Sequence, residues 1–481
     1  MQQKSGPGPV DGPVDGLVVE GHVLHVSGSP APPEVHDALV SLPDGAVAVD
    51  GSGRVGWVGH RADLPAEHAA RPRRRTGFVL PGFVDTHLHL AQTYSVDAYG
   101  GGQLLDWLER CIFPAEARLQ DPEVADRIAT DFCEQRVAAG TTSAMVFGSA
   151  FLHAQDALFS QSLEHGLRTV SGRGIQTVGP DSAKPLLTSE DAVSGLARVE
   201  IERWHGVDPR PGTAERDAML QVALVPRFAL SVTPRTLDAL GDLYADVSRR
   251  GVYVHTHLSE NDGGPWGECA AVREQFGVAR YLDAYDGGHH GPDVPRRPGL
   301  LGRRSVFAHG VHCEDGELAR LAETGSSIAH CPTSQLFLGS GTMPWRRTAA
   351  SGVHVALASD VGAGDEWLLP RVASDCFKVH MSEQGEAGVA IEPAELLFLA
   401  TLAGSRALDQ EHLTGNLDVG KEADLVLVDP DRQPTLARAL RHGVRSDDPV
   451  EATAQTLFTL LLGMREASIE AVYVRGRKVS A

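Results

Sequence analysis

The stretch Pro81-Gly82-Phe83-Val84-Asp85-Thr86-His87-Leu88-His89 places two histidines directly after an apolar run. The apolar run predicts a buried β-strand over residues 78–84. Residues i and i+2 of a strand point to the same face, so His87 and His89 present their imidazoles together just past the strand end. Two imidazoles in this arrangement can chelate a divalent metal ion. The stretch therefore indicates a metal site at the end of a buried strand.

Further apolar runs follow along the chain, and most are separated by helix-like segments such as 122–139 and 234–249. Repeated strand–helix alternation predicts a parallel sheet covered by helices. Eight strand candidates over about 280 residues fit a closed (β/α)8 TIM barrel better than an open sheet. The strand candidates are 78–84, 141–147, 167–175, 221–228, 252–257, 306–308, 327–330 and 353–358.

Both ends of the chain carry short runs of β-forming residues, and Asp50-Gly51 is a hairpin turn signal between two of them. This pattern predicts a small β-sandwich domain assembled from both termini. We expect residues 1–77 to form its N-terminal part, residues 78–414 the barrel domain and residues 415–481 its C-terminal part. The β-forming runs are 17–26, 46–58, 423–428 and 471–479.

The composition favours a soluble protein that acts on a small molecule. The 481 residues include 43 basic and 63 acidic side chains, a net charge of −20, which disfavours nucleic acid and anionic membranes as partners. The start, 1–16, lacks the apolar segment of a signal peptide, and no stretch approaches the roughly 18 apolar residues of a spanning helix. The 6 cysteines are scattered without a C-x-x-C pair, which is typical of reduced thiols. We expect a cytoplasmic location.

Other strand ends supply further metal-binding side chains. His257 closes the fifth strand candidate, His309 closes the sixth, and Asp360 follows the eighth. Active sites of TIM barrels form where the carboxyl ends of the strands meet, and imidazole and carboxylate groups are zinc ligands. Glu260 follows His257 by three residues, where its carboxyl can face a substrate.

These motifs resemble those of the amidohydrolase superfamily, in the branch of aminohydrolases that use one divalent metal ion. The terminal β domain and the late stretch 415–424 (GNLDVGKEAD) are similar as well. Within this branch, the chain most resembles the guanine deaminases. The blocks that carry this closer resemblance are 103–108 (QLLDWL), 113–118 (FPAEAR), 226–231 (PRFALS) and 330–341 (HCPTSQLFLGSG).

The resemblance implies a zinc-dependent deamination by a metal-bound hydroxide, since zinc lowers the pKa of bound water toward about 7. His309 would be either a further ligand or a hydrogen-bond partner of the water. Asp360 would accept the water proton, and Glu260 would protonate the ring nitrogen beside the attacked carbon. One Zn²⁺ per chain, with Fe²⁺ as the alternative, would be held by His87, His89, His257 and Asp360.

The resemblance also places Gln92, Arg227 and Phe228 at the substrate ring, and Trp107 can cover its face. Gln92 can donate and accept on a purine edge, and the rigid fork of Arg227 fits a 6-oxopurine better than adenine. The implied reaction is guanine plus water to xanthine plus ammonia. The nearest alternative is a deaminase of 8-oxoguanine, a pterin or an amino-triazine. The resemblance implies a homodimer.

Two other classes of function remain as alternatives. A binuclear cyclic-amide hydrolase needs a carboxylated bridging lysine, and only Lys184 lies between the first and fifth strand candidates. A non-catalytic scaffold would be expected to have lost a ligand or Glu260. We interpret His255 as a core or supporting residue, His330 and Cys331 as residues that shape the pocket, and the loop 283–302, with His289-His290, as surface.

Two departures from the family pattern bear on the substrate. Gln335 stands where the family commonly has Asn, and Asp365-Glu366 replaces a small hydroxyl pair after Asp360. Extra acid near the mouth would favour a different or larger aminopurine or aminopterin.

Overall fold

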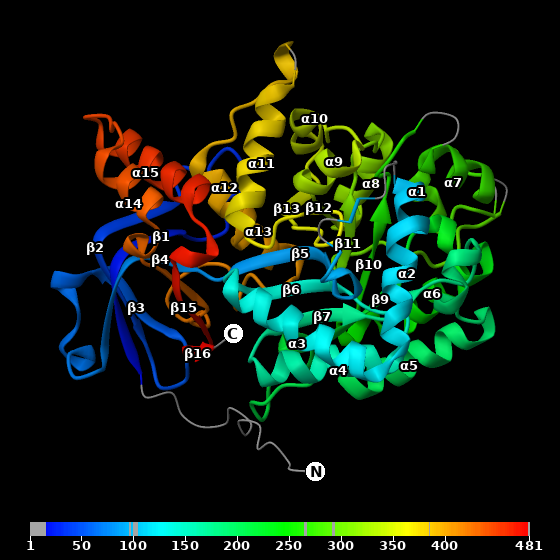
Figure 1. Cartoon of the computed structure of the whole chain (residues 1–481), viewed down its shortest axis with the longest axis horizontal. Coiled ribbons are helices and arrows are strands. Elements are labelled where there is room, and N and C mark those ends of the chain that lie inside the picture. Colours follow the sequence, from blue (N-terminus) through cyan, green and yellow to red (C-terminus); the bar gives the residue numbers. More distant parts are fainter. Residues whose placement is uncertain are drawn as a thin grey trace.

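The computed structural model describes residues 16–95, 98–99, 104–263, 267–290, 294–383 and 385–479. The start of the chain, interpreted above as lacking a signal peptide, falls almost wholly outside these residues. Two bodies lie side by side in Figure 1: a sheet built from both ends of the chain, and a barrel built from its middle.

The barrel strands are β5 (Phe83–His89), β6 (Thr141–Phe147), β7 (Arg168–Gly172), β9 (Leu220–Pro226), β10 (Tyr253–Leu258), β11 (Ser305–His309), β12 (Ser327–His330) and β13 (His354–Leu357). They pair in parallel in this order, and the short β8 (Gly174–Ile175) also pairs with β9. β5 meets β13 where Thr86 Oγ1 donates to the carbonyl of Leu357 at 2.9 Å. The expected TIM barrel is confirmed.

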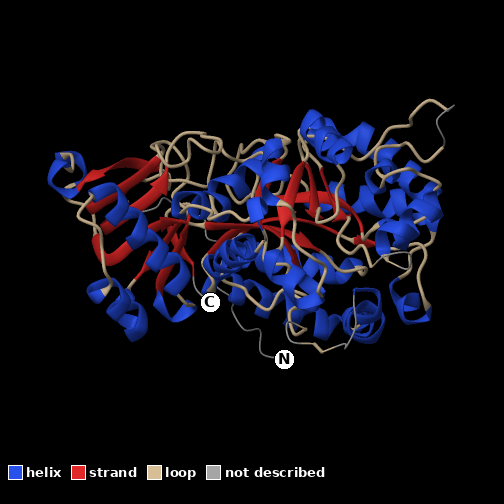
Figure 2. Cartoon of the chain, turned by 90° about the horizontal axis from the view of Figure 1, so that it is seen from above, coloured by secondary structure: helices blue, strands red, loops and turns tan. Residues whose placement is uncertain are grey.

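Helices surround the barrel strands, as Figure 2 shows, because each strand is buried on both faces and needs an apolar cover. α3 begins where the carboxylate of Asp121 accepts a hydrogen bond from the backbone of Glu123. The helices of the barrel body are α1 (Leu104–Trp107), α2 (Phe113–Ala117), α3 (Pro122–Ala138), α4 (Leu152–Glu164), α5 (Val193–Trp204), α6 (Pro234–Val247), α7 (Glu268–Phe276), α8 (Asp315–Thr324), α9 (Pro332–Leu338), α10 (Trp345–Ala350), α11 (Leu369–Ser382), α12 (Pro393–Ala400) and α13 (Leu402–Ala407).

The terminal sheet has the strands β1 (Leu17–Val26), β2 (Leu39–Val49), β3 (Val55–His60), β4 (Arg73–Pro81), β14 (Leu425–Val428), β15 (Ile469–Val474) and β16 (Arg477–Val479). Its order is β16-β15-β14-β4-β1-β2-β3, so strands from both ends of the chain lie side by side. Only the β1–β4 pair is parallel among its described pairs. α14 (Pro434–His442) and α15 (Pro449–Gly463) lie between β14 and β15 in the sequence.

The expected strand 78–84 is divided between the two sheets. Its first part belongs to β4 of the terminal sheet, and the barrel begins at Phe83. The chain passes between them at Gly82, where a Cβ atom would lie 2.1 Å from Thr142 Oγ1. Both sheets bury β-forming residues, so the apolar pattern alone does not reveal the break. The domain limits at 77/78 and 414/415 stay a prediction.

No helix among the described residues is long and apolar enough to cross a membrane. All 6 cysteines are free thiols, and all but Cys111 are buried, as their spacing indicated.

A buried network of ion pairs joins the barrel to the terminal sheet. Arg168 of β7 donates to Asp424 at 3.1 Å and also pairs with Glu422. Arg475, just after β15, binds both carboxylate oxygens of Asp208 at 2.8 Å and donates to Glu422 at 2.8 Å. The arginines and carboxylates are almost fully shielded from solvent. Each charge therefore depends on its partners across the boundary.

We predict that Arg475→Met lowers the free energy of unfolding by about 3–5 kcal/mol, because it leaves buried carboxylates without a partner. Urea unfolding of purified protein measures this change. The control is Arg61→Met, which removes an exposed pair with Asp44 and should change stability little. Equal effects of the two substitutions would contradict the importance of the buried network.

Candidate active site

Five polar side chains converge at the carboxyl end of the barrel. The Nε2 atoms of His87 and His89 lie 3.2 Å apart, and His257 Nε2 lies 3.3 Å from His89 Nε2. Asp360 Oδ1 lies 3.2 Å from the Nε2 atom of each of the two β5 histidines. Ligands of one tetrahedral zinc ion are about 3.3 Å apart. His309 Nε2 is more distant, 4.0 Å from Asp360 Oδ2.

Hydrogen bonds behind the cluster fix the direction of the imidazole lone pairs. His257 Nδ1 lies 2.6 Å from the carbonyl of Arg227, and His255 Nδ1 lies 3.0 Å from that of Val306. A carbonyl only accepts, so both Nδ1 atoms carry protons. His255 Nε2 then accepts from His87 Nδ1 at 2.7 Å. The Nε2 lone pairs of His87 and His257 therefore point into the cluster, as metal ligation requires.

The charges of the cluster suit a cation. Burial lowers the pKa of His87 and of His309 to about 3 and that of His257 well below its usual value, so these imidazoles are neutral at pH 7. Burial alone would raise the pKa of Asp360, but the adjoining His87 and His89 side chains hold that pKa well below its usual range. Neutral imidazoles around an ionised carboxylate are the forms that bind a divalent metal.

The backbone is strained at three of these strand ends. Ser259, His309 and Asp360 have φ values of 47°, 75° and 51°, in the left-handed region that costs energy for residues other than glycine. The amide of Asp360 donates to the carbonyl of His87 at 2.8 Å, and that of Gly310 donates to Leu258 at 2.9 Å. These bonds hold His309 and Asp360 toward the centre of the barrel.

Glu260 provides a proton-holding group beside the cluster. Its side chain is buried, and Oε2 lies 3.3 Å from His309 Nε2. Burial raises the pKa of Glu260 well above its usual value, and the nearby charges of Asp360 and Glu268 raise it further. The site thus contains two carboxyl groups whose pKa values are shifted in opposite directions, an arrangement suited to proton transfer.

The other wall of the site contains a residue that the sequence reasoning missed. Glu116 accepts hydrogen bonds from Gln92 Nε2 at 3.0 Å and from Arg227 Nη1 at 2.7 Å. Gln92 Oε1 is buried and has no hydrogen-bond partner in the described part of the chain. A Cβ atom on Gly362 would lie 1.9 Å from that oxygen, so glycine is required there. The one carboxylate of the block 113–118 (FPAEAR) was the sequence signal that could have identified Glu116.

The expected substrate-binding residues line one cavity with the polar cluster. Gln92, Trp107, Arg227 and Phe228 lie on its walls together with Glu260. α1 leads there into a π-helical turn, Leu108–Ile112, a distortion often found at functional sites. The cavity measures about 20 Å³, roughly the room for one water molecule. A purine ring therefore enters only when lining side chains move apart.

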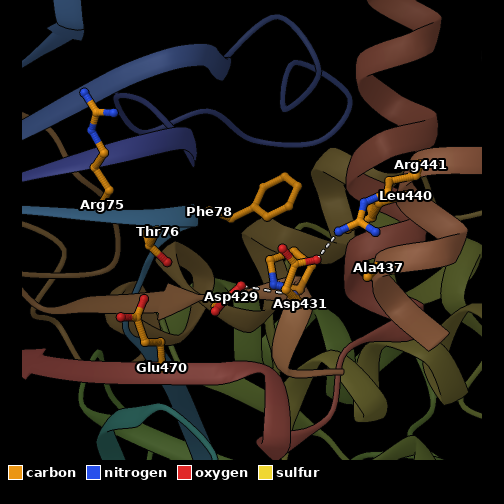
Figure 3. Close-up of a pocket in the computed structure, with 11 residues that line it drawn as sticks. Arg75, Thr76, Phe78, Asp429, Asp431, Ala437, Leu440, Arg441 and Glu470 are labelled. Carbon is orange, nitrogen blue, oxygen red and sulfur yellow. Dashed lines mark hydrogen bonds and ion pairs between the residues drawn. The ribbon is translucent and has the colours of Figure 1, made fainter. Parts of the chain in front are cut away.

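A larger hollow lies on the terminal sheet, between β4 and α14 (Figure 3). It measures about 490 Å³ and none of the candidate site residues line it. Arg441 pairs there with Asp431, and both side chains are mostly exposed. No histidine of the described residues lines this hollow, so the barrel cavity, which contains the imidazole–carboxylate cluster, is the better candidate.

Two alternatives from the sequence lose support in the structure. Lys184 is mostly exposed and pairs with Asp181 at 2.9 Å. It is therefore not positioned to bridge two metal ions. Asp365 is exposed and Glu366 lies 3.5 Å from Arg371, and neither carboxyl lines the cavity.

The segment 283–302, interpreted above as a surface loop, is exposed over residues 294–298, but residues 284–287 are buried. Tyr285 donates there to the carbonyl of His257 at 2.9 Å.

His289 and His290 do have an acidic neighbour, because Asp238 Oδ1 of α6 lies 3.1 Å and 2.9 Å from their Nε2 atoms. Arg297 also donates to this carboxylate at 3.2 Å, which supplies a competing positive charge. The contact with α6 is long-range and left no local signal in the sequence.

Comparisons with known proteins agree with this geometry. A sequence model described as the amidohydrolase family matches residues 78–479. A probable guanine deaminase from Deinococcus radiodurans is 38% identical over 469 residues, which cover 95% of this chain and 97% of that protein. The solved structure of Escherichia coli guanine deaminase has a TM-score of 0.81 at 31% identity, and the match covers 96% of this chain and 99% of the other.

A more distant relative carries a different name. A 5-methylthioadenosine/S-adenosylhomocysteine deaminase from Symbiobacterium thermophilum is 30% identical over 81% of each chain. The resemblance to guanine deaminases seen in the sequence blocks is confirmed by the more similar relatives. With the family model matched over most of its length, the chain belongs to the amidohydrolase family.

Proposed function

We propose that the protein is a metal-dependent guanine deaminase, which converts guanine and water to xanthine and ammonia. One observation carries the proposal: members of the imidazole–carboxylate cluster, Glu260 and the ring-recognition pair Gln92 and Arg227 line a single cavity. Glu116 lies behind this pair and accepts hydrogen bonds from both side chains. The relatives named above support it, since two of them are described as guanine deaminases.

The cluster fits a divalent cation, because the Nε2 atoms of three histidines lie 3.2 Å and 3.3 Å apart beside an ionised carboxylate. We propose Zn²⁺, with Fe²⁺ as the alternative, in this site. Zinc there would supply a charge that lowers the pKa of a coordinated water toward about 7. Its ligands would be His87, His89, His257 and Asp360, with His309 as a further ligand or a hydrogen-bond partner of the water.

The two carboxyl groups divide the proton chemistry. Asp360 is ionised and accepts a proton from the attacking water. Burial raises the pKa of Glu260 well above its usual value, which suits it to donate a proton to the ring nitrogen beside the amino-bearing carbon. That carbon becomes tetrahedral when the oxygen of the attacking water adds to it. The proton on Asp360 is then available to the leaving amine. The burial of both groups keeps bulk water from exchanging these protons.

The opposite wall recognises the ring. The unpaired Gln92 Oε1 can accept from a ring N–H, and Arg227 can donate to a ring carbonyl. A 6-oxopurine offers both groups, whereas adenine has no carbonyl. Trp107 and Phe228 supply apolar surface for the ring face. Glu116 is a positioning residue, since its carboxylate holds the polar groups of Gln92 and Arg227 in place.

Other expectations from the sequence stay predictions: the homodimer, the cytoplasmic location and the absence of nucleic-acid and membrane partners.

The substrate is tested by ammonia release from a panel of guanine, 8-oxoguanine, a pterin, an amino-triazine and 5′-methylthioadenosine, with zinc-loaded protein. We expect guanine to give the highest kcat/KM. No turnover of guanine, alongside turnover of another compound in the panel, would overturn the substrate assignment while leaving the reaction class intact.

We predict that Glu260→Gln keeps its metal but lowers kcat by at least about 100-fold, because Gln cannot donate the proton. Steady-state kinetics and elemental analysis measure the two effects. In the wild type, kcat should fall as pH rises through the raised pKa of Glu260. Glu317→Gln, at a buried glutamate of α8 outside the cavity, is the control. Near wild-type activity of Glu260→Gln would refute the proton-donor role.

We predict that Glu116→Gln lowers kcat/KM for guanine about 10–100-fold, mainly through KM, because Gln92 and Arg227 lose a charged partner. The metal content should not change. The control is Glu200→Gln, at a buried carboxyl that accepts a hydrogen bond from the Arg173 backbone. A loss confined to kcat, or an equal loss in the control, would show that Glu116 does not orient the recognition groups.

A further inference from the structure

A second cluster of metal-binding side chains lies between the barrel and α11. His330 ends β12, and Cys376 and His380 lie four residues apart on one face of α11. All three side chains are fully buried. One ligand atom from each lies within 4.8 Å of the others, and the Nε2 atoms of the two histidines are 3.0 Å apart. This is close to the separation of about 3.3 Å expected for two ligands of one tetrahedral ion.

Neighbouring side chains set the direction of the two imidazoles. His380 Nδ1 lies 2.9 Å from Glu383 Oε1, so this nitrogen donates and the Nε2 lone pair points to His330. Such a carboxylate behind a histidine is common at metal ligands. Gln335 lies on the far side of the His330 ring, with Nε2 3.4 Å from Nδ1.

The amide of Gln335 has one buried atom without a partner. Its Oε1 has no hydrogen bond in the described part of the chain. Rotating the amide by 180° brings this oxygen to the Nδ1–H of His330 and satisfies it. The Nε2 lone pair of His330 then faces that of His380 at 3.0 Å. Two lone pairs at this distance repel each other unless a cation or a proton lies between them.

The charges of the cluster match a divalent ion. Binding of an ion would form a metal–sulfur bond and release one proton to solvent. The thiolate and the carboxylate of Glu383 would then offset the two positive charges. The Glu383 side chain is 14% exposed, whereas the three ligands are fully buried.

We propose that His330, Cys376 and His380 form a second metal site that binds a zinc-type divalent ion and joins α11 to β12. Three protein ligands leave the fourth tetrahedral position to water. An ion there would lie outside the deamination chemistry, because none of its three ligands lines the active-site cavity. It is independent of which heterocycle the enzyme deaminates. The competing arrangement is a hydrogen bond between two neutral imidazoles, in which Cys376 takes no part.

The test uses the full-length protein stripped with a chelator, reloaded with Co²⁺ or Zn²⁺ and freed of excess metal. We expect about two metal ions per chain, and a near-ultraviolet thiolate-to-Co²⁺ charge-transfer band. Cys376→Ser should lose the band and about one ion, while guanine turnover changes little. His257→Ala should keep the band, because it removes a ligand of the other site only.

Cys133→Ser is the matched control, since Cys133 is a buried helical thiol of α3 outside every metal-binding cluster of the described residues. It should keep both ions and the band. His380→Gln provides a second variant should Cys376→Ser not fold. One ion per chain and no charge-transfer band in the wild type would overturn the proposal and favour the imidazole hydrogen bond. A band that survives in Cys376→Ser would do so as well.

Discussion

The candidate active site depends on a set of lone pairs that face one another. The Nε2 atoms of His87, His89 and His257 crowd together at the centre of the barrel, 3.2–3.3 Å apart along the chain of contacts. Hydrogen bonds to a backbone carbonyl and to His255 hold His257 and His87 with their Nε2 lone pairs toward this centre, where a positive charge would stabilise them. Holding these polar side chains together lowers the stability of the fold, as is common at functional sites.

The same desolvation gives two carboxyl groups opposite properties. Asp360 is surrounded by imidazoles and stays ionised, whereas Glu260 is buried beside other acids and keeps its proton. A base and an acid can therefore coexist in one cavity at neutral pH. The positive φ values of His309 and Asp360 show that the backbone is strained where these groups are presented. The proton-transfer groups and the ring-recognition groups line the same small cavity, so side chains must move when a purine binds.

The local pattern of apolar and polar residues in the sequence was enough to predict most of the fold and the polar cluster. The alternation of apolar runs and helices predicted the barrel, and β6 has the expected bounds. His87, His89, His257, His309 and Asp360 were identifiable because each follows an apolar strand. The break at Gly82 was hidden, since apolar residues continue across it into a different sheet.

Residues whose role comes from distant partners could not be predicted. Glu116 pairs with Arg227 across 111 positions, and Asp238 meets His290 across 52. The neighbouring sequence indicates the partner of neither carboxylate. The cluster of His330 with Cys376 and His380 is of the same kind, because His330 meets His380 of α11 across 50 positions. His330 does not line the active-site cavity, contrary to its interpretation as a pocket residue.

The most direct measurement is an anomalous diffraction experiment at the zinc edge on crystals of the zinc-loaded protein. Our account predicts a strong peak at the carboxyl end of the barrel, about 2.0–2.2 Å from the Nε2 atoms of His87, His89 and His257 and from an oxygen of Asp360. An anomalous map without a peak among these four side chains, from protein that deaminates guanine, would contradict it.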